Sequence, residues 1–350
     1  MTSKYRRLRH QAAGHDGSLT DSDELLIFKP SNKSEIDFYE ILQAEELNVE
    51  SHDDIPLRRW LPTYLGNLEV GVSSKVSISE NAQVFQDLAT HASALNDEIA
   101  SSNAKPLVVL ENLVKGFSKP NILDVKLGKI LYDDYASEEK KARLSNVSKS
   151  TTSGSLGFRI CGMKIQNSGK VARLKEEHFE SAPDGYVCIN KLYGRSLKED
   201  NVLDGFELFF GNDALSSHRQ EKVIDMFFKR LQLFYNTLLS EEVRLISSSL
   251  LFIFEGDPKR WDDLRDTDHL LRDEFLNGED SDSCSDEESI STGSDQIHTY
   301  KTQLLSSLSL IDFAHSSVSK GQGYDENVLC GVESLIDIFA KMIKYKTEVH

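Results

Sequence analysis

The sequence predicts an α+β fold, because short apolar runs of strand length alternate with amphipathic helical patterns. An apolar run occupies residues 107–110, and apolar residues flank two charged ones within 120–128. Their β-branched residues favour extended backbone. Residues 216–244 instead place Val223, Phe227 and other apolar side chains at helical spacing. A chain of 350 residues, 39% of them hydrophobic, is long enough for one large two-lobed domain or two small ones.

Composition excludes several classes of protein. The net charge is −17, which argues against direct nucleic-acid binding or general attraction to anionic membranes. The four cysteines lie far apart in the sequence, so neither a zinc site nor a disulfide framework is expected. The first residues lack the apolar core of a signal peptide, and no apolar run approaches the roughly 18 residues that a membrane span needs. We therefore expect a soluble, intracellular protein with no membrane span.

One window of the chain departs from this acidic average. Residues 115–170 carry eleven Lys and Arg but five Asp and Glu, a local balance of +6. A basic window in an acidic protein predicts a local anion-binding site.

The residues with the clearest chemistry form the stretch 120–128, which has the pattern Pro-x-x-x-Asp-x-Lys-x-Gly. In extended backbone, Asp124 and Lys126 point to the same side, because side chains alternate along a strand. This arrangement sets an acceptor for hydroxyl groups beside a donor for phosphate oxygens. Alone, such a pair is more often an ordinary surface ion pair.

The whole stretch resembles the signature of the inositol polyphosphate kinase family, and four further blocks of that family follow it in order. The resemblance spans residues 10–340 and is strongest to the fungal multikinase members. It implies a two-lobed fold, similar to protein kinase and ATP-grasp folds, with ATP in the interlobe cleft. The N-terminal lobe would be residues 1–112, with a variable insertion at about 73–105, and the C-terminal lobe residues 113–350.

The resemblance also implies how ATP is held. Lys29 would contact the nucleotide phosphates beneath a covering turn at residues 14–17. A helix is expected to start at Ser34, and either Glu35 or Glu40 would pair with Lys29; the sequence does not decide between them.

At the hinge, the Glu111 carbonyl and the Leu113 amide would bind adenine. Asp124 would contact the ribose hydroxyls or the attacking hydroxyl, and we favour the ribose. Lys126 would bridge the accepting hydroxyl and the transferred phosphoryl group. Asp312, in a stretch that resembles the kinase Asp-Phe-Gly with Ala314 as its third residue, would bind magnesium.

The substrate phosphates would meet a set of basic side chains. A short segment at 129–156, with a helix capped by Ser137 and about two regular turns, would face them. The blocks at 151–166 and 186–195 would each form a turn beside a strand. The expected contacts are Lys140, Lys141, Arg143, Lys164, Lys191 and His315.

The resemblance implies an ATP- and magnesium-dependent multikinase that converts inositol trisphosphate and tetrakisphosphate toward the pentakisphosphate. The alternatives are a single-position trisphosphate kinase, a hexakisphosphate kinase, or mainly a binding protein of a transcription-factor complex that controls arginine metabolism. The fungal relatives favour a nuclear and cytoplasmic location, mainly nuclear. The pattern His-Arg-Asp is absent from the sequence, which argues against protein substrates.

A second insertion, at about 273–300, is strongly acidic. Residues 273–288 hold eight acids and no base. Such composition predicts disorder, and the segment would act as a partner-binding or solubilising region.

Overall fold

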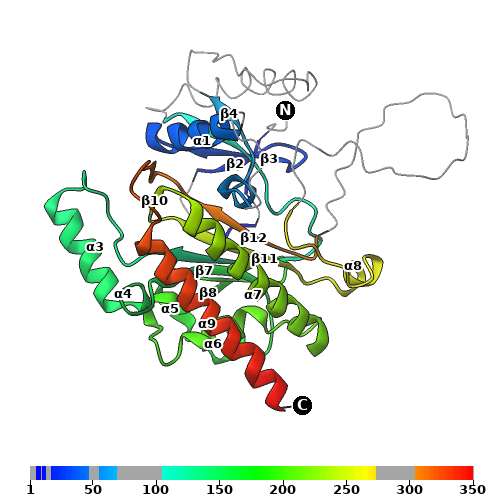
Figure 1. Cartoon of the computed structure of the whole chain (residues 1–350). Coiled ribbons are helices and arrows are strands. Elements are labelled where there is room, and N and C mark those ends of the chain that lie inside the picture. The colour runs from blue at the N-terminus through cyan, green and yellow to red at the C-terminus, as the bar shows by residue number, and fades with distance from the viewer. Residues whose placement is uncertain are drawn as a thin grey trace, which may run out of the picture.

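The computed structural model describes residues 5–8, 10–12, 17–46, 55–68, 105–272 and 304–349. These residues form two lobes (Figure 1). Residues 14–16 of the expected turn at 14–17 and most of the insertion at 73–105 lie outside the described residues, as does the acidic insertion at 273–300. Within the described residues, no helix is both long enough and apolar enough to cross a membrane.

The N-terminal lobe is built on an antiparallel five-stranded sheet in the order β1-β2-β3-β5-β4. The strands are β1 (Arg6–Arg7), β2 (Leu19–Thr20), β3 (Leu26–Pro30), β4 (Tyr64–Leu68) and β5 (Leu107–Glu111). Helix α1 (Lys33–Glu46) follows β3, and a short 3-10 helix η1 (Leu57–Trp60) precedes β4. The expected strand at 107–110 is therefore confirmed, and β5 leads directly into the segment that joins the lobes.

Helix α1 begins one residue before the expected N-cap, Ser34. The Asn32 side chain accepts a hydrogen bond from the Glu35 amide at 2.9 Å. Asn32 thus satisfies an amide at the helix start, the role that the sequence pattern had assigned to Ser34.

The C-terminal lobe contains an antiparallel six-stranded sheet in the order β12-β11-β6-β7-β9-β8. Its strands are β6 (Pro120–Leu127), β7 (Phe158–Gln166), β8 (Phe179–Ser181), β9 (Tyr186–Ile189), β11 (Ser249–Glu255) and β12 (Ser306–Ile311). A separate pair is formed by β10 (Val243–Ile246) and β13 (His315–Val318). The stretch with the Asp-x-Lys pattern is therefore a central strand.

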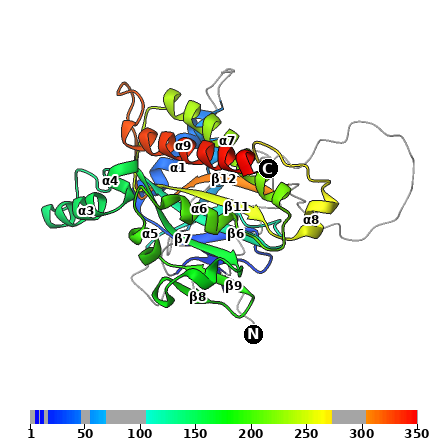
Figure 2. The same cartoon turned by 90° about the horizontal axis from the view of Figure 1, so that it is seen from below.

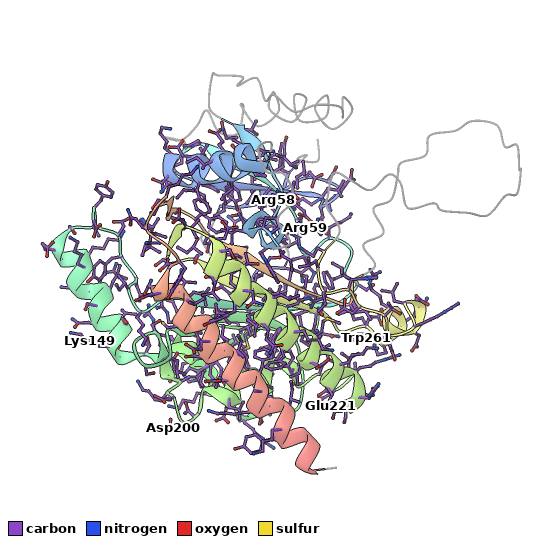
Figure 3. The ribbon with its side chains drawn as sticks, viewed as in Figure 1. Arg58, Arg59, Lys149, Asp200, Glu221 and Trp261 are labelled. Atoms are coloured by element: carbon purple, nitrogen blue, oxygen red, sulfur yellow. The ribbon has the colours of Figure 1, made fainter. Side chains whose placement is uncertain are left out.

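Helices cover one face of this sheet. Helices α7 (Ser217–Ser240) and α9 (Glu326–Val349) pack side by side across it (Figures 1 and 2). The remaining elements are α3 (Glu138–Ser150), α4 (Thr152–Leu156), η2 (Val171–Arg173), η3 (Glu176–His178), α5 (Lys191–Ser196), α6 (Val202–Phe210) and α8 (Pro258–Asp263). Side chains of this lobe fill the space between sheet and helices (Figure 3).

Two expectations about local structure are corrected. Lys191 was placed in a turn but starts helix α5, because the Asn190 side chain caps it by accepting from the Leu192 amide. The segment 129–156 is more helical than the two expected turns, since it contains α3 and α4. The Ser137 cap of α3 is confirmed.

Candidate active site

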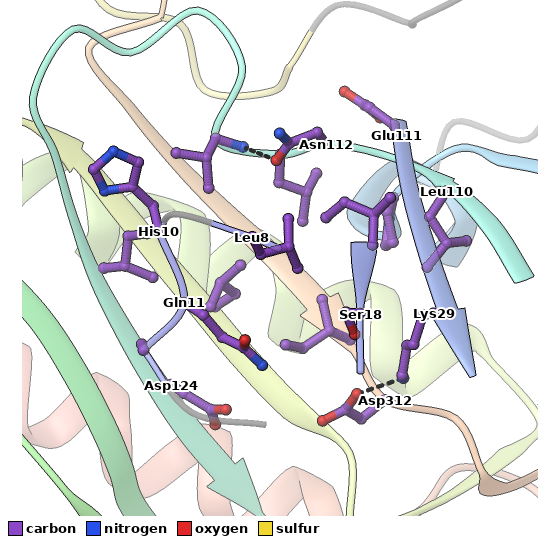
Figure 4. A pocket seen from close by; sticks show the side chains of 18 of the residues that line it. Leu8, His10, Gln11, Ser18, Lys29, Leu110, Glu111, Asn112, Asp124 and Asp312 are labelled. Atoms are coloured by element: carbon purple, nitrogen blue, oxygen red, sulfur yellow. Dashed lines mark hydrogen bonds and ion pairs between the residues drawn. The ribbon is translucent and has the colours of Figure 1, made fainter. Parts of the chain in front are cut away.

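A pocket lies between the two lobes, on the face of the six-stranded sheet opposite α7 and α9 (Figure 4). Its walls are mostly apolar, and its polar end contains Lys29, Asp124 and Asp312. The wall side chains include Leu8, Ile27, Leu110, Leu113, Ile122, Leu251 and Ile311. A largely apolar pocket with charged groups at one end suits a nucleotide, whose base is apolar on its faces and whose phosphates are charged.

Lys29 projects from β3 between two carboxylates. Its Nζ lies 2.8 Å from Glu35 and 2.6 Å from Asp312. Burial alone lowers the pKa of Lys29, but the charges of Asp312 and Glu35 outweigh burial and raise it above its usual value. Glu35, and not Glu40, is therefore the partner that the sequence left undecided, and Lys29 is held as a cation.

Glu35 also ties the lobes together. Its side chain is 1% exposed and accepts from the Ser31 hydroxyl at 2.6 Å and from the Phe313 amide at 3.1 Å. Because Phe313 follows Asp312, this contact fixes helix α1 against the end of β12. Glu40 lies elsewhere, 3.4 Å from the Tyr64 hydroxyl.

Asp312 occupies unusual backbone at the end of β12. Its φ is 67°, in the left-handed region that costs energy for a residue with a Cβ. The side chain remains 36% exposed and points toward the pocket (Figure 4). A carboxylate held in this way at the phosphate end of the pocket fits a role as a metal ligand.

Asp124 is 5% exposed, and among the described residues its Oδ1 atom has no hydrogen-bond partner. Burial, followed by the charge of Asp312, raises its pKa to about 6, and Lys126 offsets this only in part. A buried carboxylate with an unsatisfied oxygen has capacity for a ligand hydroxyl or cation. A divalent cation at Asp312 would also relieve the repulsion between the two carboxylates.

Lys126 lies on the same side of β6 as Asp124, as the strand pattern predicted. Its Nζ donates to the Ser247 carbonyl at 2.5 Å, and Ser247 has a φ of 60° in the turn between β10 and β11. In the sheet, Lys126 lies opposite Arg159 of the neighbouring strand β7. The Arg159 guanidinium donates to the Ser153 hydroxyl at 2.9 Å. Sequence reasoning gave Arg159 no role, although it lies in the block at 151–166 that contributes to the resemblance.

The hinge residues Glu111 and Leu113 both line the pocket, as expected for adenine contacts. The roles of their carbonyl and amide remain predictions. Unexpectedly, the Glu111 side chain is also engaged: it accepts from the Thr63 amide and hydroxyl at 3.1 and 3.0 Å, and lies 2.6 Å from Arg272.

The six expected substrate contacts are placed in different surroundings, and none of them lines the pocket. Lys140, Lys141 and Arg143 lie on α3, which projects from one side of the C-terminal lobe (Figure 1). Lys141 lies 3.0 Å from Glu138. The His315 Nδ1 lies 2.5 Å from Asp133, in the segment that leads to α3.

The surroundings of Lys164 and Lys191 differ more from those expected of substrate contacts. Lys164 is 5% exposed, lies 3.4 Å from Asp184 and sits over the Tyr186 ring. Lys191 is exposed at the first residue of α5. The structure therefore joins His315 to the segment that leads to α3, whereas Lys164 is paired with Asp184.

Sequence reasoning missed the N-terminal segment at 10–12, which crosses the cleft face of the sheet. His10, Gln11 and Ala12 line the pocket, and Gln11 points toward the space between the two aspartates (Figure 4). A Cβ at Gly162 would lie 2.3 Å from the Ala12 carbonyl oxygen, so this close crossing requires glycine. The start of the family resemblance at residue 10 was the one sequence signal that could have pointed to this segment.

No group of three or more His, Cys, Asp or Glu side chains among the described residues is arranged to hold a metal ion by itself. Asp312 at the phosphate end nonetheless fits magnesium or manganese, because these ions are commonly held by one or two carboxylates together with nucleotide phosphates and water.

Comparisons with known proteins agree with this geometry. A family model described as inositol polyphosphate kinase matches residues 107–340. The inositol polyphosphate multikinase of Saccharomyces cerevisiae is 51% identical, over 97% of this chain and 99% of that protein. The Schizosaccharomyces pombe multikinase is 29% identical over the same shares of the two chains.

A solved structure extends the likeness to the fold. The S. cerevisiae inositol phosphate multikinase Ipk2, crystallised with ADP and Mn²⁺, superposes with a TM-score of 0.70 and 47% identity. The match covers 91% of this chain and 99% of that one. The chain therefore belongs to the inositol polyphosphate kinase family and is an ATP-dependent kinase of the two-lobed fold that the sequence predicted.

Proposed function

We propose that this protein is an inositol polyphosphate multikinase, which phosphorylates inositol trisphosphate and tetrakisphosphate toward the pentakisphosphate with ATP. The observation that carries the proposal is the 51% identity to a multikinase over nearly the whole length of both chains. The ion-paired Lys29, Asp312 and the buried Asp124 around one pocket support it independently.

We propose the following role for each group around the pocket. Adenine lies in the apolar part of the pocket beside Glu111 and Leu113, and Lys29 holds the nucleotide phosphates. Asp312 binds the magnesium ion, which neutralises phosphate charge when it is bound. Asp124 contacts the ribose hydroxyls, as its buried, unsatisfied Oδ1 allows.

Lys126 acts where the phosphoryl group is transferred. It lies two residues from Asp124 on the cleft face of β6. Its Nζ donates to the Ser247 carbonyl, which holds the side chain in place. Phosphoryl transfer needs mainly alignment of the reacting groups and neutralisation of charge. A lysine between the accepting hydroxyl and the transferred phosphoryl group supplies both.

The substrate phosphates would meet α3 and His315. In α3, the cations Lys140 and Arg143 are three residues apart and share a face. The segment is more helical than the sequence suggested, yet it remains short, and lysine accepts phosphates in more than one geometry. Few enforced contacts give little discrimination between inositol phosphates, because specificity is a difference of affinities.

A time course with the purified full chain, ATP, magnesium and inositol trisphosphate tests the proposal. Anion-exchange chromatography should resolve a tetrakisphosphate peak that rises and then gives way to pentakisphosphate. A tetrakisphosphate that never converts further would replace the proposal with a single-position kinase. Turnover of inositol hexakisphosphate in preference to the trisphosphate would instead identify a hexakisphosphate kinase.

We also propose a nuclear role in a transcription-factor complex that controls arginine metabolism. The supporting feature is the acidic run at 273–288, which suits a partner-binding segment. A cell that carries only the Lys126→Met variant should keep arginine-responsive transcription while its pentakisphosphate disappears. Loss of both together would leave no separate binding role.

A further inference from the structure

The side chain of Arg272 forms an ion pair with the hinge residue Glu111, and Arg272 itself does not line the pocket. Its guanidinium lies 2.6 Å from the Glu111 carboxylate, and the two side chains are 12% and 10% exposed. The other oxygen of Glu111 accepts from the Thr63 amide and hydroxyl. The carboxylate is therefore held on both oxygens, and its backbone lines the pocket.

Arg272 also contacts the N-terminal lobe. It donates to the Leu61 carbonyl at 2.8 Å, and its own carbonyl accepts from Arg59 at 2.9 Å. Leu61 and Thr63 flank Pro62, another residue of the pocket wall. Arg272 thus joins the hinge to the loop that enters β4.

The segment 268–272, called the hinge strap below, is anchored at its other end in the C-terminal lobe. Asp268 lies 3.3 Å from Arg230 and accepts from the Ser306 hydroxyl at 2.5 Å. The side chains of Asp268 and Arg230 are each 2% exposed. Arg230 also donates to the carbonyls of residues 269 and 270. One end of the strap is therefore fixed to α7 and β12, and the other to the hinge.

We infer that Arg272 is a positioning residue for nucleotide binding, which acts through Glu111 to set the hinge backbone against adenine. The inference rests on the adenine site proposed above. Without Arg272, the Glu111 carboxylate would lose the cation that compensates its burial. An uncompensated buried charge is unfavourable, so the carboxylate would move toward water. Such movement would displace the hinge carbonyl and amide, and small displacements of binding groups lower affinity.

The test compares Arg272→Gln with a matched control, Arg219→Gln. Arg219 also bridges carboxylates, at 2.5 Å to Asp262 and 2.8 Å to Asp266, and its side chain is 17% exposed. It joins α7 to the α8 region and does not line the pocket. Each variant loses a guanidinium that makes two contacts: Arg272 contacts Glu111 and the Leu61 carbonyl, and Arg219 contacts two carboxylates. Only a role at the hinge separates them.

The expected result is a selective loss of nucleotide affinity. In Arg272→Gln, the KM for ATP and the Kd for ADP by calorimetry should rise about five- to tenfold, while kcat stays within about twofold. Inhibition by inorganic tripolyphosphate, which lacks adenine, should not change. Arg272→Lys should recover part of the affinity, because lysine restores the charge but not the two-point contact.

The control should show wild-type values for the KM for ATP, the Kd for ADP and kcat. Equal KM and Kd in Arg272→Gln and wild type, with a melting temperature lowered as in Arg219→Gln, would overturn the inference and leave a purely structural tie. The ADP measurement needs no inositol phosphate. If wild type bound ADP but phosphorylated no inositol phosphate, the proposed function would fail while the role of Arg272 was still decided.

Discussion

The two faces of strand β6 have the same backbone but opposite character. Toward α7 and α9, Leu123, Val125 and Leu127 are completely buried in the main core. Toward the cleft, Asp124 and Lys126 carry charge in a partly or fully buried setting. Figure 4 shows Asp124 on this second face, close to the N-terminal segment.

The difference shows that one face of β6 stabilises the fold, whereas residues on the other face serve the active site at a cost in stability. Apolar burial on the helix face stabilises the fold in proportion to the area removed from water. On the cleft face, the carboxylate of Asp124 is desolvated without full hydrogen bonding, which costs free energy. The following predictions separate the two faces, with the largest expected effect first.

Lys126→Met should lower the turnover of inositol trisphosphate by about 10²–10³-fold, because one charge-stabilising donor at the transition state is lost. The melting temperature should stay close to that of wild type, since the side chain is only partly buried and the methionine stem fills similar space. Steady-state kinetics and a thermal melt measure both quantities.

The control is Lys119→Met, directly before the first residue of β6, where the lysine is 52% exposed and 3.9 Å from Asp257. This variant should turn over normally. A Lys126→Met enzyme with near-normal turnover would remove Lys126 from the reaction.

Neighbouring residues on opposite faces offer a second contrast. Leu123 is 0% exposed on the helix face and Ile122 is 1% exposed on the cleft face. Leu123→Ala should lower the free energy of unfolding by about 2–5 kcal/mol, the usual cost of a core cavity, and leave the KM for ATP unchanged. Ile122→Ala should instead raise the KM for ATP, because Ile122 lines the pocket.

Urea unfolding and ATP kinetics on both variants measure this contrast. If Leu123→Ala raised the KM for ATP as much as Ile122→Ala did, the separation of the two faces into core and site would be wrong.

The smallest effect is expected from Asp124→Asn, which should stabilise the protein above pH 6. The pKa of Asp124 rises from 3.8 to about 6 in the fold, so the folded state prefers the protonated form. Its contribution to stability is fully present below pH 3.8 and lost as the pH rises through 6. Asparagine avoids this loss, which is at most about 3 kcal/mol from the size of the shift.

Urea unfolding of wild type and Asp124→Asn at pH 5 and pH 8 measures the effect, and the gain should be larger at pH 8. Asp184→Asn is a control of opposite sign: partial desolvation raises the pKa of Asp184, but Lys164 outweighs it, so the pKa is lowered. That variant should lose stability above the usual carboxyl pKa. A gain for Asp124→Asn that did not grow with pH would contradict the raised pKa.

Much of the site followed from local sequence. The Asp-x-Lys spacing placed Asp124 and Lys126 on one side because strand side chains alternate, and the structure confirms this. The Ser137 cap of α3 and the apolar face of α7 followed equally from local rules. Lys191 was misplaced in a turn, since an Asn190 cap starts a short helix there.

The sequence by itself determined the strand and helix pattern, the pairing of functional groups within β6 and, through resemblance, the kinase family. Only the tertiary structure decided that Glu35 pairs with Lys29, that Lys164 is paired with Asp184, and that Arg272 holds Glu111, 161 positions away along the chain. The physical reason is that backbone periodicity acts over a few residues. Ion pairs between residues far apart in the sequence depend on how the elements pack in three dimensions, which local sequence patterns do not specify.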